Sequence, residues 1–172
     1  MLLVARLWLG WQWVSAAFDK LASPVWTGAH AGVGVKGFLS HAVALSTGPH
    51  AAVQGWYADL IKAVALPGST GFSYLISYGE LFIGVALILG CVTTFAALMG
   101  AVLNVAYLLA GTVSTNPNML IIEVLVLVAG FNAAIIGLDH WIIPWLRERR
   151  RHTGSVYSNT SHQEDKPLGH GA

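Results

Sequence analysis

Charged residues are scarce in this chain. Asp, Glu, Lys and Arg make up 10% of its 172 residues, 55% are hydrophobic, and the mean hydropathy is +0.63. Soluble domains carry about a quarter charged residues. The composition therefore excludes an ordinary soluble globular protein and indicates an integral membrane protein. A formal net charge of +1 excludes a strongly basic surface, so no nucleic-acid partner is expected.

Cysteine is also nearly lacking, and histidines are not grouped. Cys91 is the one cysteine, which excludes an internal disulfide and a zinc site of several thiolates. His30, His41 and His50 lack the spacing of ligands on one helix, and no histidine falls within a predicted span. The sequence has no phosphate-binding loop, dinucleotide fingerprint or nucleophile elbow. We expect no metal site and no covalently bound cofactor.

Long apolar stretches are what the chain has in abundance. A membrane-spanning helix takes about 20 mostly apolar residues, and four stretches qualify: 2–21, 72–90, 94–112 and 119–138. The second and third are three residues apart, and Asn-Pro-Asn at 116–118 is a turn signal before the fourth. We predict an all-α fold, an integral membrane four-helix bundle made by residues 1–146.

The connection between the first two spans, residues 22–71, does not have the composition of a linker. Residues 36–45 and 51–65 both have the apolar faces of amphipathic helices, and Pro49 separates them. We predict two short helices that cap one end of the bundle.

Arginines determine the predicted orientation. The arginine-rich run at 147–151 directly follows the fourth span, and such segments stay cytoplasmic. Four spans then place the N-terminus in the cytoplasm too, in agreement with Arg6, and the connection 22–71 outside. Residues 147–172 are predicted to be a cytoplasmic, disordered polar tail. Alternatively, residues 1–17 are a cleaved signal peptide, which leaves three spans.

Small residues recur at a spacing of four in the third and fourth spans. Ala96 and Gly100 precede Asn104 on one face, and Gly130 precedes Ala134 on another. Small residues let helices approach closely in a membrane. We expect these faces to be helix contacts.

Two glutamates lie inside the predicted spans, where an ionisable group needs a partner. Helix rise places Glu80 and Glu123 at a similar depth, roughly 6–12 Å from the outer surface. Lys20 ends the first span at the same level and is the expected counter-ion for one glutamate. Asp19 lies beside it. Hydrogen bonds are expected from Tyr78, Asn104 and Tyr107.

Two interpretations of this polar cluster stay open. In the first it is structural and fixes the register of the helices. In the second it binds a small polar or quinone-like ligand reached from the outer leaflet, and a glutamate is the proton acceptor. The second interpretation makes Glu80 and Glu123 catalytic. Its substrate-binding residues are Lys20, Asp19, Tyr78, Asn104 and Tyr107.

An ordered series of short motifs resembles the DoxX/DoxD family. The motifs are WLGWQW near the start, WTG at Trp26, GFLSHA at Gly37, WYADL at Trp56, YGELFIGVALILG at Tyr78, LLAGTVST ending at Thr115, NPN at Asn116 and GLDHWIIP at Gly137. They extend from about residue 6 to residue 144. The resemblance implies a four-helix protein of a bacterial or archaeal cell membrane.

The resemblance also implies an activity. The DoxD branch is the large subunit of thiosulfate:quinone oxidoreductase, which works with a small DoxA subunit and passes electrons from thiosulfate to a membrane quinone. Other DoxX-like proteins are linked with redox-stress complexes. The YGEL motif makes Glu80 a functional position by this resemblance. No DoxA-like segment is present in this sequence.

We therefore hypothesise a DoxX-type membrane subunit in quinone-linked redox chemistry, acting on a small sulfur anion. The chain has no haem signature, so electrons pass by direct contact between substrates or through a partner, such as a DoxA-like subunit. One alternative is a non-catalytic anchor or assembly subunit that binds a soluble partner or anionic lipid through the 147–151 run. Another is a small-molecule transporter, which requires more than one four-span unit or an oligomer such as a homo-oligomer.

Overall fold

The computed structural model describes residues 2–130 together with Gly137 and Leu138, and these residues form six α-helices, one π-helix and no strand. The all-α prediction is thus confirmed. The helices are α1 (Leu2–Leu21), α2 (Val33–Ala44), α3 (Gly55–Leu60), the π-helix η1 (Ile61–Ala65), α4 (Ser69–Leu89), α5 (Thr93–Leu109) and α6 (Asn116–Ala129). The predicted tail and the end of the predicted fourth span fall outside the described residues.

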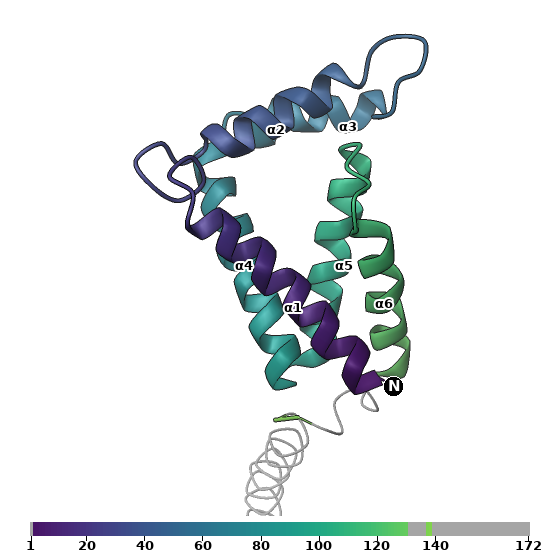
Figure 1. Ribbon diagram of the computed structural model, residues 1–172. Coiled ribbons are helices and arrows are strands. Elements are labelled where there is room, and N and C mark those ends of the chain that lie inside the picture. Colours follow the sequence, from purple (N-terminus) through teal and green to yellow (C-terminus); the bar gives the residue numbers. More distant parts are fainter. Residues whose placement is uncertain (1, 131–136, 139–172) are drawn as a thin grey trace, which may run out of the picture.

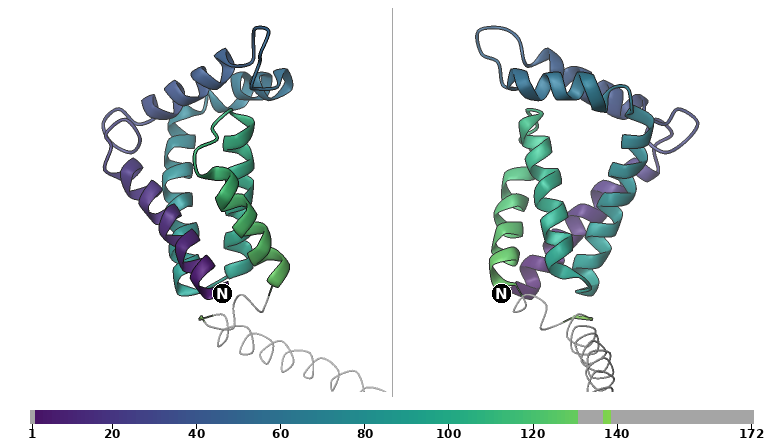
Figure 2. Two further views of the ribbon diagram at one scale, coloured as in Figure 1. Left: turned by 45° about the vertical axis from the view of Figure 1, so that its right-hand side comes forward. Right: turned by 180° about the vertical axis from the view of Figure 1, so that it is seen from behind.

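Four helices form a bundle, and the remaining ones lie across one end of it. Figure 1 shows α1, α4, α5 and α6 running between two ends, with α2 and α3 crossing above the end where α1 finishes and α4 begins. Both views of Figure 2 show the same layering. The two amphipathic helices predicted in the connection 22–71 are therefore present, and they cap the bundle as expected.

The α1 and α4 helices cross in close contact at two glycines. A Cβ added at Gly84 would lie 2.7 Å from Val14 N and 2.8 Å from Gly10 O, and one added at Gly10 would lie 2.9 Å from Gly84 O. Backbone atoms fill these spaces, so glycine at both positions is what lets the helices touch.

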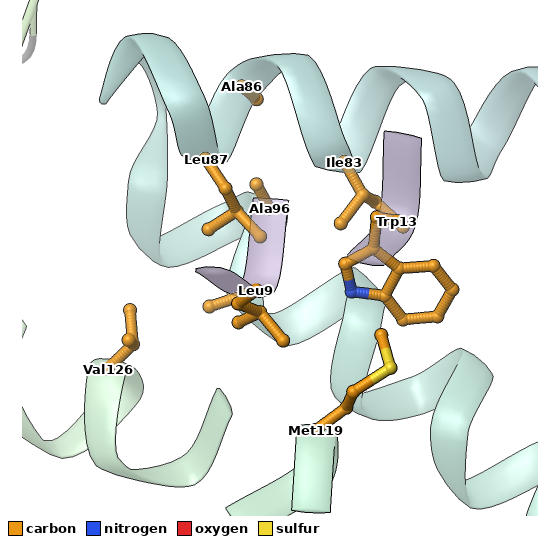
Figure 3. Packing of buried hydrophobic residues seen from close by; sticks show 9 residues of the cluster. Leu9, Trp13, Ile83, Ala86, Leu87, Ala96, Met119 and Val126 are labelled. Carbon is orange, nitrogen blue, oxygen red and sulfur yellow. The ribbon is translucent and has the colours of Figure 1, made fainter. Parts of the chain in front are cut away.

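The bundle core is built around Trp13. Figure 3 shows its ring between Ile83 of α4 and Met119 of α6, and it is 2% exposed. Trp8, Trp11 and Trp56 are exposed, as expected for tryptophans at a membrane interface. The buried members of this core are Leu9, Trp13, Ile83, Ala86, Leu87, Ala96, Ala97, Met119 and Val126.

A second apolar cluster holds the cap on the bundle. Val35, Leu39 and Ala42 of α2 pack with residues of α3, η1 and the end of α5. The Tyr57 hydroxyl fastens α3 to α5 by donating a hydrogen bond to Ala106 O at 2.9 Å. The cap is thus a packed part of the fold.

One described helix qualifies as a membrane span by its length and composition. Ser69–Leu89 is long and apolar enough to cross a bilayer, whereas Thr93–Leu109 and Asn116–Ala129 are apolar but shorter. The α1 helix is long enough, but Arg6, Gln12 and Asp19 lower its hydropathy. The predicted fourth span is not one helix, because α6 ends at Ala129 and Gly130 takes a positive φ of 51°.

Candidate functional site

Glu80 and Lys20 form an ion pair within the helix bundle. The Lys20 ammonium group donates to Glu80 Oε2 at 2.7 Å, and the side chains are 19% and 1% exposed. Tyr107 of α5 donates its hydroxyl proton to the other oxygen, Oε1, at 2.6 Å. Three helices therefore meet at one carboxylate. The expected pairing of Lys20 with a glutamate is confirmed.

Further contacts fix the Lys20 side chain. Its ammonium group lies 3.4 Å from Ala16 O and 5.2 Å from the centre of the Trp26 ring. The contact with Trp26 is a cation–π interaction, and a cation in the last turn also suits the helix dipole. The charge of Lys20 is thereby held at the mouth of the bundle beside Glu80.

A pocket of about 310 Å³ opens at this ion pair, and we call it the head pocket. Lys20, Glu80 and Tyr107 supply its polar wall. Apolar and aromatic side chains of α1, α2, α4, α6 and the loop after α1 complete the lining. The lining also includes Gln12, Trp13, Trp26, Phe38, Ile76 and Met119. A volume of this size fits a small ligand with a flat ring.

The loop between α5 and α6 closes one side of the head pocket. Thr112, Ser114, Thr115 and Asn116 belong to the lining, and Asn116 holds the loop by donating to Thr112 O at 3.0 Å. Gly111 and Ser114 have φ values of 83° and 34°. A positive φ costs a serine free energy, so the surrounding contacts hold this turn in place.

The second buried carboxylate, Glu123, belongs to a separate cluster. Asn104 donates to both of its oxygens at 2.9 Å, and Trp13 Nε1 donates to Oε1 at 2.9 Å. A Cβ added at Gly100 would collide with Glu123 Oε1. The stripe of Ala96, Gly100 and Asn104 is therefore a helix contact, as predicted, and it also makes room for the carboxylate.

Of the predicted substrate-binding residues, Asp19 and Tyr78 lie away from both carboxylates. Tyr78 is 55% exposed and stacks on Tyr74, with ring centres 6.4 Å apart. Tyr78 precedes Glu80 by two residues, which is about 200° around a helix, so the two side chains point to opposite faces. Asp19 is exposed and, among the described residues, has no hydrogen bond or ion pair. The prediction that Tyr78 makes a hydrogen bond in this cluster was wrong.

Several residues of the site were missed by sequence reasoning. Trp13 is the main one: it lines the head pocket and also donates to Glu123. A signal was available, since Trp13 lies two helical turns before Lys20 on the same face of α1. Phe38 and the 112–116 loop gave no such signal, because tertiary packing alone brings them to Lys20.

The histidines in the cap do not form a site. His30, His41 and His50 are all exposed. Within the part of the chain that the structure describes, no three His, Cys, Asp or Glu side chains lie close enough together to hold a metal ion.

The fold and the site together describe an all-helical protein with a charged pair and a buried carboxylate inside an apolar bundle. The sequence model of the DoxX family matches residues 1–113. This match covers well over half of the chain, and the protein belongs to the DoxX family. The members of this family are generally membrane proteins. No curated protein and no solved structure matches the chain.

Proposed function

We propose that this protein crosses a membrane four times and takes part in quinone-linked redox chemistry at the head pocket. The observation that carries the proposal is the Lys20–Glu80–Tyr107 triad, which lines a pocket together with apolar and aromatic side chains and the polar 112–116 loop. Ionisable groups are rare inside apolar bundles and tend to mark functional sites.

The four-span topology has support from the bundle and from the family. The α4 helix is long enough to cross a bilayer, and α5 and α6 continue as apolar antiparallel neighbours. The charges of α1 lie in the core, as with Arg6, or at its end, as with Lys20. In this topology the cap faces the outside of a bacterial or archaeal cell membrane, and both termini are cytoplasmic.

The head pocket suits a quinone ring. Trp13, Trp26 and Phe38 offer flat apolar surfaces. The Lys20 ammonium group has three N–H donors, so it can donate to a carbonyl oxygen while it keeps its hydrogen bond to Glu80. Lys20 also attracts an anion to the same opening. The site thus combines the features that a sulfur anion and a quinone each need.

In the proposed reaction the triad carries protons. Glu80 takes up a proton from water at the mouth of the pocket, where its other oxygen is next to Lys20. Tyr107 Oη then gives its own proton to an oxygen bound in the pocket and receives the proton of Glu80 in return, and two such transfers supply the two protons of the quinol. In the reaction implied by the DoxD branch, two thiosulfate ions each lose one electron and join by a new sulfur–sulfur bond, and two electrons and two protons convert one quinone to a quinol.

Glu123 has a different part in this proposal. It does not line the head pocket, but its hydrogen bond from Trp13 fixes the ring that does. We therefore treat Glu80 as the catalytic carboxylate. Glu123 and Asn104 are positioning residues that act through Trp13.

The experiment follows thiosulfate-dependent quinol formation in membranes that contain the full chain. Glu80→Gln is compared with Asp19→Asn, which makes the same change of carboxylate to amide at an exposed residue outside the pocket. We expect Glu80→Gln to slow the reaction at least about 100-fold, the usual contribution of a positioned acid–base group. Asp19→Asn should retain the activity of the unmodified protein. Equal activity in all three membranes, at equal amounts of folded protein, would contradict the proposal.

A further inference from the structure

A second pocket, of about 270 Å³, lies next to the head pocket between the cap and the bundle, and we call it the tail pocket. The two pockets share three lining residues, Phe38, Ile76 and Tyr107. Phe38 and Tyr107 meet edge to face at 6.1 Å between ring centres. The wall between the pockets thus consists of three side chains, one of which holds Glu80.

The tail pocket is apolar throughout. Apart from Tyr57 and Tyr107, its lining consists of Val, Phe, Leu, Ile and Ala side chains. The Tyr57 hydroxyl is already bonded to Ala106 O, and burial raises the pKa of Tyr57, so this phenol remains neutral. Hydrocarbon is the chemical class that such a lining favours.

The tail pocket also has an open rim on the surface of the bundle. Leu60, Val64 and Leu75 line it and are 49%, 52% and 67% exposed. In a bilayer these side chains face lipid. A chain longer than the pocket has a way out between them into the hydrocarbon.

The π-helix η1 forms one wall of the tail pocket. Leu66 N donates to Ile61 O at 2.9 Å, five residues back, which is the π-helical pattern. Ile61, Val64 and Ala65 of this short segment all line the pocket. A single π-turn next to an α-helix is rare and is frequently found at functional sites.

We infer that the tail pocket binds the apolar tail of the same molecule whose ring occupies the head pocket. The ligand class is therefore a quinone with a hydrocarbon tail, and the cap helices form its tail site. This inference rests on the proposed function, which assigns the ring to the head pocket.

The test compares binding of two quinones that have the same ring, one without a tail and one with a ten-carbon alkyl tail. The full chain in detergent micelles is titrated with each, and quenching of tryptophan fluorescence reports the ring near Trp13 and Trp26. Ala65→Phe fills the tail pocket. Ala63→Phe is the matched control, because Ala63 lies on the same π-helix, is exposed and does not line the pocket.

We expect Ala65→Phe to weaken binding of the tailed quinone about tenfold or more, as loss of contact with two or three methylenes would. The dissociation constant of the tailless quinone should change by less than about twofold. Ala63→Phe should leave the binding of both quinones unchanged. The inference is wrong if Ala65→Phe weakens the binding of both quinones equally, or if it weakens the binding of neither quinone. If Lys20→Met also has no effect on the tailless quinone, the proposed function itself has failed.

A second measurement does not depend on the folding of a variant. A tailed quinone with a photoreactive group at the end of its tail is cross-linked to the unmodified protein. We expect labelled peptides from η1 and from the first half of α4, which carries Phe72, Leu75 and Ile76. Labelling confined to α1 or α6 would overturn the inference.

Discussion

Glu80 holds a charge inside an apolar bundle because each of its oxygens has a strong donor. The ammonium group of Lys20 is at 2.7 Å from one oxygen and the phenol of Tyr107 at 2.6 Å from the other. Glu123 is held differently, by the neutral donors of Asn104 and Trp13. The two carboxylates therefore respond differently to the loss of one partner.

Lys20→Met removes the cation and leaves Glu80 buried. A buried charge that loses its partner costs about 3–5 kcal/mol, so the free energy of unfolding should fall by about that amount. The check is denaturant-induced unfolding of the protein in micelles.

Lys62→Met is the control for this change. Lys62 and Asp59 also form an ion pair, at 3.3 Å, but their side chains are 54% and 77% exposed. Exposed pairs contribute little, so the effect should stay below about 1 kcal/mol. If Lys20→Met and Lys62→Met lowered the free energy of unfolding by similar amounts, burial of Glu80 would not be the reason for the effect of Lys20.

Trp13→Phe removes the donor to Glu123 and keeps an aromatic ring in the core. A typical hydrogen bond contributes about 0.5–1.5 kcal/mol, and a loss of about that size is expected in the free energy of unfolding. The matched control is Trp11→Phe on the same helix, where the ring is exposed. The prediction is wrong if thermal unfolding shifts equally in the two variants.

At the scale of elements, the bundle depends on close helix approach. The α1 and α4 helices touch through Gly10 and Gly84, and α5 gives space to Glu123 at Gly100. The α2 and α3 helices have short apolar faces that cannot be buried alone, so they are stable only against the bundle. Element packing, more than any single bond, determines where Lys20 and Glu80 meet.

Gly84→Ala should force α1 and α4 apart, because its Cβ would overlap backbone atoms of α1. Overpacking of this kind costs about 1–3 kcal/mol. Gly79→Ala on the same helix meets no atom within 4 Å and should raise stability by up to about 1 kcal/mol through helix propensity. The unfolding temperature should therefore fall in Gly84→Ala and rise in Gly79→Ala. Shifts of the same sign in the two variants would contradict the prediction.

At the scale of the whole molecule, the cap and the α4–α5 turn mark opposite ends of the bundle. The α4 helix begins under the cap and ends at the turn that contains Cys91 (Figure 1). In the proposed topology one end faces the outside and the other the cytoplasm. Both ends carry residues accessible to a label.

Cysteine labelling with a membrane-impermeant maleimide tests this topology. Ala51→Cys, in a Cys91→Ala background, places a thiol in the exposed connection of the cap. We expect it to react in intact cells, whereas native Cys91 reacts only after the membrane is permeabilised. Labelling of both in intact cells would contradict the spanning topology, and the reverse pattern would invert the orientation.

Sequence reasoning predicted the elements well where local patterns suffice. Apolar runs predicted the bounds of α1, α4 and α5 to within a few residues. Amphipathic patterns predicted α2 and the α3–η1 segment. Charge scarcity predicted Lys20 as the partner of one glutamate, because few groups inside an apolar body can neutralise each other. The Gly130 backbone turn was not predicted, since glycine is also common in continuous membrane helices.

The sequence by itself determined the helical class, the family resemblance and the identity of the buried charges, because each depends on local composition or spacing. Only the tertiary structure decided which carboxylate pairs with Lys20, since Glu80 and Glu123 lie at similar depths on different helices. It also turned Tyr78 outward, brought Trp13 to Glu123 and placed an apolar pocket behind Tyr107. Those relations depend on helix rotation and crossing, which side-chain packing between distant segments sets.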